Sequence, residues 1–203
     1  MIWAGKLVAP PQGLRVAHAY AALSLLGFLL AAAWPPLFKL LALSSGGSPG
    51  LRTLTGFVTH PFVPPSAAAW AWPAGFIYLS AYLLRRVLDD AQQVQLFFGG
   101  ILAGGVTFLL MAGEPLIFVG GGLAAWAYTG GAVLFGMLKW RWLSWPWRAF
   151  VIWMALSLAI RGTELAVPQT ALSVAALAGA TLVAAWSRSW SSKLGGENLD
   201  GIK

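Results

Sequence analysis

Residues 119–138, VGGGLAAWAYTGGAVLFGML, are twenty consecutive residues without a charge, which is the length and composition of a membrane-spanning helix. The stretch opens with three glycines in a row, from Gly120 to Gly122. Glycines at such a place let two backbones, or a backbone and a ligand, approach closely. Ser, Cys, Asp, His and Lys are absent from the whole stretch. The glycines therefore predict close packing rather than a phosphate-binding or catalytic loop.

The overall composition agrees with this interpretation. Hydrophobic residues make up 59% of the 203 residues and charged residues 9%, and the mean hydropathy is +0.74, as in polytopic membrane proteins. The absence of cysteine excludes disulfides, iron–sulfur clusters and thiolate metal sites. The net charge of +7 comes from cations scattered between apolar runs, which is typical of residues that set membrane topology. We expect contact with the lipid bilayer, and neither a nucleic-acid partner nor a cofactor.

The apolar runs predict an all-α polytopic membrane protein. Six transmembrane helices are expected, over residues 16–40, 67–84, 94–111, 115–138, 147–160 and 168–186. Residues 51–66 are moderately apolar but are interrupted by three prolines, so they are predicted to form a re-entrant or interfacial segment in the first outer loop. Residues 1–187 then form a single transmembrane domain, and residues 188–203 form a polar cytoplasmic tail.

The distribution of cations supports six spans with both termini in the cytoplasm. With the N-terminus inside, ten of the 13 Lys and Arg residues fall on the inner side and three on the outer side. Adding or removing one central span would scramble this bias. Many of the 12 tryptophans fall at the predicted interfaces, where the amphipathic indole is favoured.

Small residues four apart mark faces where helices are expected to pack closely. The predicted helix-packing pairs are Gly100 with Gly104, Gly120 with Ala124, and Ala175 with Gly179. A bundle built on three such faces leaves little room for a wide aqueous pore. The spans also lack paired carboxylates, a proton relay and a mid-membrane histidine that could ligate haem, so the sequence offers no polar interior for an ion-coupled transporter.

Four segments together resemble the bacterial rhomboid family of intramembrane serine proteases. The first is LRTLTGFVTH (51–60), similar to the family's W-R-x-L-T-x-x-F-x-H and keeping Arg52 and His60. The others are RRVLDDAQQVQLFFGGILAGG (85–105), VGGGLAAW (119–126) and ALSVAALAG (171–179), which are similar to segments of the family's third, fourth and sixth spans. The resemblance implies a six-helix rhomboid-like bundle over residues 50–186.

The same resemblance implies that the protease active site is absent. The family's nucleophilic serine falls on Gly122 and its base histidine on Leu172, so both are degenerate active-site positions. The family's oxyanion-stabilising residues have no counterpart in either alignment of the second span. They fall on Pro65 and Ala69 when counted from His60, or on Pro73 and Ile77 when counted back from residues 86–90. Because a dyad needs both a hydroxyl and a base, we expect no proteolysis and no catalytic residue.

The leading hypothesis is therefore a catalytically inactive pseudoprotease of the bacterial cytoplasmic (inner) membrane. It would bind or scaffold transmembrane segments of other integral membrane proteins, with the partner helix docking against the second and fifth spans. An alternative is an accessory structural subunit of a larger respiratory, photosynthetic or secretion complex. A protease with a relocated nucleophile and a small-molecule transporter remain further alternatives.

Overall fold

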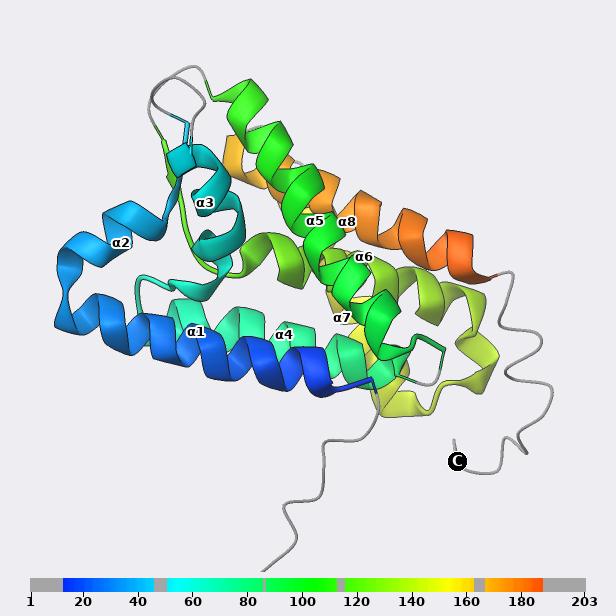
Figure 1. Cartoon of the computed structure of the whole chain (residues 1–203). Helices are drawn as coiled ribbons and strands as arrows, with labels where there is room; N and C mark the ends of the chain where they lie inside the picture. Colours follow the sequence, from blue (N-terminus) through cyan, green and yellow to red (C-terminus); the bar gives the residue numbers. More distant parts are fainter. Residues whose placement is uncertain (1–12, 46–50, 86, 113–115, 163–166, 188–203) are drawn as a thin grey trace, which may run out of the picture.

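The computed structural model describes residues 13–45, 51–85, 87–112, 116–162 and 167–187 (Figure 1). The described chain is almost entirely helical. Its helices are α1 (Arg15–Ala33), α2 (Pro35–Leu41), α3 (Leu51–Thr59), α4 (Ala67–Leu84), α5 (Asp90–Met111), α6 (Gly122–Leu138), α7 (Trp145–Gly162) and α8 (Val167–Ser187). Two short 3₁₀ turns, η1 (His60–Phe62) and η2 (Trp140–Trp142), and two two-residue strands, β1 (Leu43–Ser44) and β2 (Ile117–Phe118), complete the described elements.

The bundle is that of a helical membrane protein. Helices α1, α4, α5 and α8 are long and apolar enough to cross a membrane, whereas the apolar parts of α6 and α7 are shorter. Each of the six apolar runs predicted from the sequence overlaps one of these six helices. The predicted tail, 188–203, lies outside the described residues.

Two predicted spans differ from the structure by seven residues at one end, and the third begins at Asp90 rather than at residue 94. The run 16–40 is divided into α1 and α2, because Pro35 and Pro36 lack the amide hydrogen needed to continue α1 but suit the first turn of a new helix. The predicted fourth span began at residue 115, yet residues 116–121 are not helical and α6 begins at Gly122. The predicted re-entrant segment, 51–66, forms α3, η1 and the turn leading to α4.

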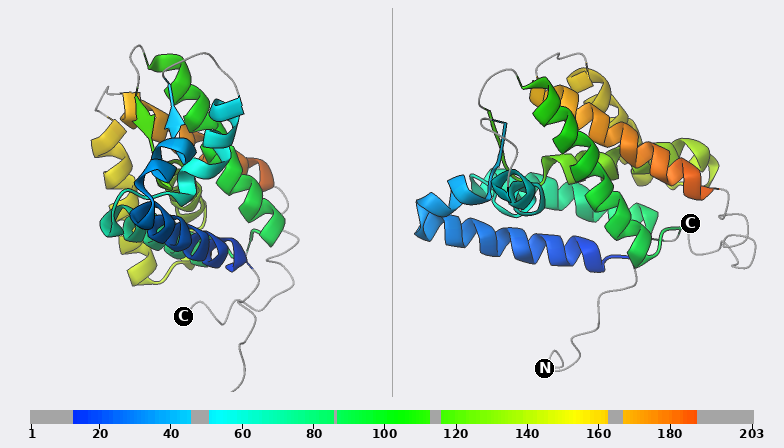
Figure 2. Two further views of the ribbon diagram at one scale, coloured as in Figure 1. Left: turned by 60° about the vertical axis from the view of Figure 1, so that its left-hand side comes forward. Right: turned by 45° about the horizontal axis from the view of Figure 1, so that its top comes forward.

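Helix α6 lies in the middle of the molecule. All the residues from 123 to 132 are buried, and α6 packs against α4, α5, α7 and α8 (Figure 2). On one side of it α1 lies along α4, and on the other side α5 crosses α8. A helix surrounded on all sides by protein needs side chains small enough for its neighbours to approach, which explains its alanines and glycines.

Helices α6 and α8 cross backbone to backbone. A Cβ atom added to Gly130 would overlap the carbonyl oxygen of Ala176, and one added to Gly179 would overlap the carbonyl oxygen of Ala127. The two glycines thus face opposite helices at the same crossing. Gly179 belongs to a predicted packing pair, whereas Gly130 was not among the predicted packing residues.

Helix α5 packs against this pair through its own glycines. A Cβ on Gly104 would lie 2.8 Å from the Ala171 carbonyl oxygen and 3.2 Å from the Ala175 Cβ, both on α8. A Cβ on Gly100 would overlap the Ala127 side chain of α6. The predicted small faces of α5 and α8 thus meet each other and α6.

The other predicted pair, Gly120 with Ala124, is divided by the start of α6. Ala124 is fully buried within α6. Gly120 precedes the helix and has φ +82°, a conformation that side chains disfavour, so it serves as a turn residue.

Local capping explains where α4 and α5 begin. Ser66 Oγ accepts a hydrogen bond from the Ala69 amide at the start of α4. Asp89 and Gln92 form a reciprocal capping box at the start of α5, with distances of 2.8 and 3.1 Å.

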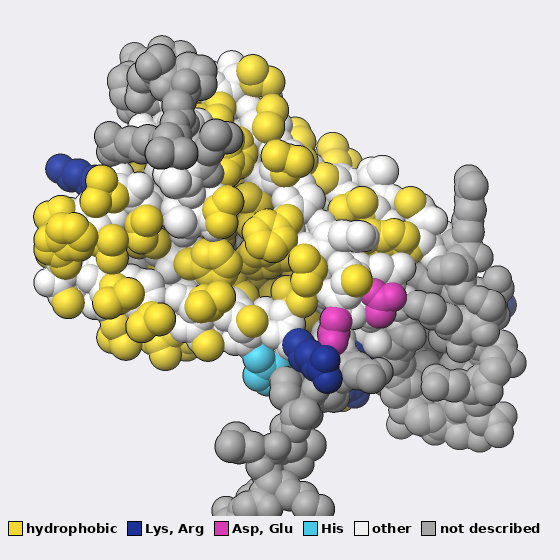
Figure 3. All heavy atoms as spheres, viewed as in Figure 1, with side chains coloured by type: hydrophobic (Ala, Val, Ile, Leu, Met, Phe, Trp, Pro, Cys, Tyr) yellow, Lys and Arg dark blue, Asp and Glu magenta, His cyan; other side chains and the backbone are white. Residues whose placement is uncertain are grey.

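One face of the molecule carries a broad apolar surface with charges near its edges (Figure 3). Large exposed apolar side chains include Leu29 on α1 and Leu110 on α5, which are 55% and 81% exposed. At the edge where α1 and α5 begin, Arg15 pairs with Asp90 at 3.5 Å. This distribution fits a helical bundle whose sides contact lipid.

Candidate functional site

The turn before α6 is the place to which the sequence assigns the degenerate active site. Two contacts that are distant in sequence hold this turn. Strand β2 pairs antiparallel with β1, bringing Phe118 opposite Leu43. The amide of Gly120 donates a 2.8 Å hydrogen bond to the carbonyl oxygen of His60. Because residues 117–120 are held by these bonds in an extended and turned conformation, α6 starts inside the bundle rather than at its surface.

His60 connects this turn to α3. Its side chain is fully buried, and Nδ1 donates to the Gly56 carbonyl oxygen at 2.8 Å, which leaves Nε2 unprotonated in the neutral ring. The ring meets Phe118 edge to face, with centroids 5.8 Å apart. Burial lowers the pKa of His60 to about 4, so the ring is neutral at physiological pH. His60 is therefore a structural residue between α3 and the turn.

Thr59, whose hydroxyl is the nearest to His60 in the sequence, also has a structural role. Thr59 Oγ1 lies 2.8 Å from the carbonyl oxygens of both Leu41 and Thr55. These contacts hold α2 against α3 and direct the hydroxyl toward main-chain acceptors. Thr59 is therefore not arranged as a nucleophile activated by a histidine.

Positions 122 and 172 lie face to face. A Cβ atom on Gly122 would lie 3.3 Å from Leu172 Cδ2 and 3.8 Å from Phe118 Cζ. Gly122 opens α6 and Leu172 lies in the second turn of α8, fifty positions later in the chain. The two segments were matched to the rhomboid pattern separately, yet the fold brings them into contact. Neither residue carries a hydroxyl or a base, so this contact is apolar.

The two alternative sets of oxyanion positions lie at different distances along α4. The backbones of Pro64 and Ala69 flank the turn, with the Pro64 Cα and the Ala69 carbonyl oxygen each 3.9 Å from a Cβ placed on Gly120. Ala69 belongs to the set counted from His60. Ile77, from the other set, is two turns further along α4 and buried. Side chains of the first set offer no hydrogen-bond donor.

Tyr20 of α1 also packs against the turn and was not predicted from the sequence. Its hydroxyl lies against Gly121, where a Cβ atom would overlap it. Its ring packs against those of Phe62 and Phe97, with centroids 6.0 and 5.5 Å away. The only sequence signal is a tyrosine inside an apolar helix, and that signal does not identify what the ring contacts. Tyr20 and Leu172 together close the turn with large side chains.

Helices α4 and α7 meet through aromatic side chains, which we call the aromatic seam. Its two ring pairs are Phe76 with Trp153, 5.0 Å apart, and Tyr82 with Trp147, stacked at 5.4 Å. Between them, Ser80 Oγ donates to Met154 Sδ at 3.7 Å. The backbone of α7 packs instead against α6 and α8. The predicted docking face on the second and fifth spans therefore corresponds to this seam.

Two remaining predictions can be placed only in part. Arg52 belongs to α3, but its side chain lies outside the described residues. Within the described ranges, no cluster of three or more His, Cys, Asp or Glu residues is arranged to hold a metal ion.

Comparison with known proteins adds no identification. No protein-family model matches the chain. Neither the curated proteins nor the solved structures contain a match. The fold defines a helical membrane protein. A more specific function has to be argued from the residues and contacts of this chain.

Proposed function

We propose that this protein is a non-catalytic, rhomboid-like bundle of six transmembrane helices in the bacterial cytoplasmic membrane, with both termini in the cytoplasm, and that it binds transmembrane segments of partner proteins. The contact between Gly122 and Leu172 is the observation that carries the proposal. Two positions matched separately to a catalytic dyad are adjacent, and both lack reactive groups. Two adjacent positions that match the dyad but carry neither a nucleophile nor a base support binding of a transmembrane segment without its cleavage.

The aromatic seam supplies a docking route. Its ring contacts and one weak hydrogen bond to sulfur join α4 to α7. Rotating a few aromatic side chains would therefore open the seam without disturbing the glycine-packed crossing of α6 with α8. Trp153 and Tyr82 are 50% and 38% exposed, so they already offer apolar surface to an incoming helix. A partner helix would exchange lipid contacts for contacts with these rings.

Site-specific photocrosslinking in native membranes tests the proposal. A photoreactive phenylalanine analogue is placed at Trp153 in the seam, and as a matched control at Leu102, which is 61% exposed on α5. We expect discrete adducts with integral membrane proteins from position 153 and none from position 102. Equal adduct patterns at both positions, or none at either, would refute docking at the seam. A fluorophosphonate probe should leave the chain unlabelled, and labelling would instead reveal a relocated nucleophile.

A second candidate function is that of a fixed accessory subunit of a larger membrane complex. It is favoured by α1, whose window of membrane-spanning length is only 17% buried. Leu23, Leu26 and Leu30 share one face of this helix and are 50–52% exposed. Purification in mild detergent separates the two functions. A constant stoichiometry with the same partners supports the subunit, whereas varied and substoichiometric partners support the transmembrane-segment binder.

A further inference from the structure

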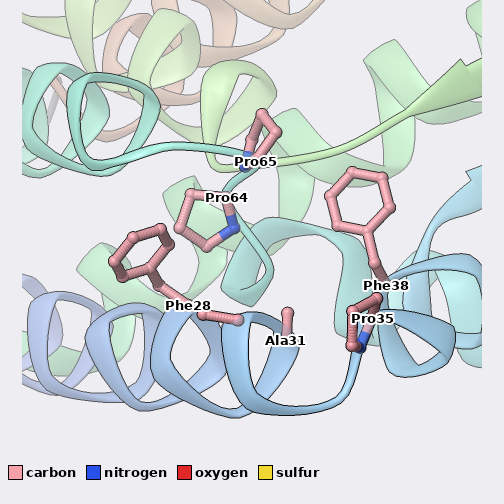
Figure 4. A pocket seen from close by; sticks show the side chains of 7 residues that line it. Phe28, Ala31, Pro35, Phe38, Pro64 and Pro65 are labelled. Atoms are coloured by element: carbon pink, nitrogen blue, oxygen red, sulfur yellow. The ribbon is translucent and has the colours of Figure 1, made fainter.

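A pocket of about 390 Å³ lies away from the aromatic seam, between α1, α2 and the turn after η1 (Figure 4). Every lining side chain is apolar. The lining residues are Phe28, Ala31 and Ala32 of α1, Pro35 and Phe38 of α2, and Pro64 and Pro65 of the turn. Figure 4 shows that the hollow separates α1 and α2 from the opposing prolines.

Proline keeps this pocket open. Pro35 fixes the sharp junction between α1 and α2, and Pro64 and Pro65 form the opposite wall. Their backbone φ angles are locked and they have no amide hydrogen, so these three positions cannot donate a backbone hydrogen bond across the gap. At its base, Gly27 packs directly against the carbonyl of Phe62, and this contact prevents η1 from sinking further onto α1. The hollow is therefore preformed.

The occupant of such a pocket must be apolar and thin. Water is disfavoured because the lining side chains offer it no hydrogen-bonding group, and it needs two to four partners. A whole transmembrane helix is too large, since about 20 residues of helix 10–12 Å across occupy roughly 2,500 Å³. The volume lies within the range of sites for single small ligands, about 300–1,000 Å³. A single flexible hydrocarbon chain satisfies all three conditions.

The surroundings show where such a chain would come from. Beside the pocket, α1 also carries exposed apolar side chains, and Leu29, the residue after Phe28, is 55% exposed. Trp34, at the junction of α1 and α2, is 53% exposed, as expected for an indole at the level of the headgroups. Lys39 is an exposed cation in the last turn of α2. We propose that this pocket binds one acyl chain of a membrane phospholipid whose headgroup lies beside α2.

The bound acyl chain would act as an exchangeable spacer between two parts of the protein. It would fill the space between the α1–α2 junction and the prolines that lead into α4. In this position it supports the segment that carries His60 without contacting Gly122 or Leu172. The inference is independent of the function proposed above, because it rests on the pocket and the residues around it and not on the positions 122 and 172.

Photolabelling with a lipid tests it. The full-length protein is reconstituted in vesicles of phosphatidylethanolamine and phosphatidylglycerol that contain a trace of phosphatidylglycerol with a diazirine in its acyl chain. After illumination, mass spectrometry compares adducts on residues 28–38 with adducts around Leu102, a lipid-exposed reference on α5. We expect at least about five-fold more labelling at the pocket, because a chain held in the hollow stays beside these residues, whereas lipid at the open face of α5 exchanges freely with the bilayer. Equal labelling in the unmutated protein would overturn the proposal.

Filling the pocket provides the second test. Ala31→Phe places a ring in the hollow, and Ala22→Phe places the same ring on an exposed part of α1 outside it. Pocket labelling should fall to the reference level in the first variant and stay unchanged in the second. Ala32→Leu, a smaller change, should give an intermediate loss if Ala31→Phe fails to fold. Labelling that persists in a folded pocket variant, or that falls equally in Ala22→Phe, would refute the assignment.

Discussion

The crossing of α6 with α8 makes the sharpest prediction about stability. In Gly130→Ala the new methyl group would overlap the carbonyl oxygen of Ala176. A backbone oxygen cannot rotate away as a side chain can, so the two helices must separate locally. A gap of 0.5–1 Å loses about a quarter to a half of the attraction of each atom pair. If about 40 pairs across the crossing each lose a third of about 0.15 kcal/mol, the free energy of unfolding falls by about 2 kcal/mol.

The opposite glycine tests whether the crossing behaves as one unit. Gly179→Ala directs its methyl group at the carbonyl oxygen of Ala127 and should cost about as much. Once the first substitution has separated the helices, the second methyl group has room. The double variant should therefore lose clearly less than the sum of the single losses.

The measurement is unfolding of the purified proteins in mixed micelles, followed by circular dichroism as the fraction of sodium dodecyl sulfate rises. Gly75→Ala is the matched control, because a Cβ there has no atom within 4 Å. It should leave stability unchanged or raise it by up to about 1 kcal/mol, because alanine suits a helix better than glycine. Gly130→Ala within about 0.5 kcal/mol of wild type, or strict additivity in the double variant, would refute the close crossing.

Two further predictions concern the elements around the turn. Asp89→Ala removes the capping box with Gln92 and should lower the free energy of unfolding by about 1 kcal/mol in the same assay, whereas Asp89→Ser should retain most of the stability. His60 is neutral in the folded protein, while its unfolded pKa is about 6.5, so wild-type stability should fall as pH drops from about 6.5 to about 4, by up to roughly 3 kcal/mol. His60→Asn, whose amide can replace the Nδ1–H bond to Gly56, should lack this part of the pH dependence, and equal slopes in both proteins would contradict the buried neutral ring.

Hydrophobic periodicity and length placed the helices, because a run of apolar residues without charges has few alternatives in a membrane. Pro35 and Pro36 fall inside the predicted first span, and in the structure they divide it into α1 and α2. The start of α6 was misplaced for a different reason. Residues 116–121 are as apolar as the helix that follows, and what unwinds them is pairing with β1 and with the His60 carbonyl. Such bonds between segments more than fifty positions apart have no local sequence signal.

Packing partners were predicted less completely than helices. The spacing of small residues identified Gly104 and Gly179, which meet other helices in the regular way. It missed Gly27, which packs against the carbonyl of Phe62 in a 3₁₀ turn, because that partner is not a helix. It also missed Gly121 beneath the Tyr20 hydroxyl. Spacing rules describe helix pairs, so contacts with loops and single side chains fall outside them.

The three glycines at the start of α6 do not all have the same structural reason. Gly120 needs its positive φ angle, and Gly121 has no room for a side chain beneath Tyr20. At Gly122 a Cβ would meet only the flexible end of Leu172, at 3.3 Å. Packing therefore explains the first two glycines but does not require the third. Gly122→Ser should fold with a stability within about 0.5 kcal/mol of wild type, as expected where no special feature is disturbed.

Adding a base should still not restore proteolysis. In Gly122→Ser combined with Leu172→His, the hydroxyl and the imidazole would face each other across α6 and α8. The side chains of Pro65 and Ala69 would still offer no donor to a developing oxyanion, and each missing donor costs roughly a hundred- to a thousand-fold in rate. Labelling by a fluorophosphonate probe without cleavage of a model transmembrane substrate is the expected result. Efficient cleavage would show that the dyad alone was lost and that the rest of a protease site survives in this fold.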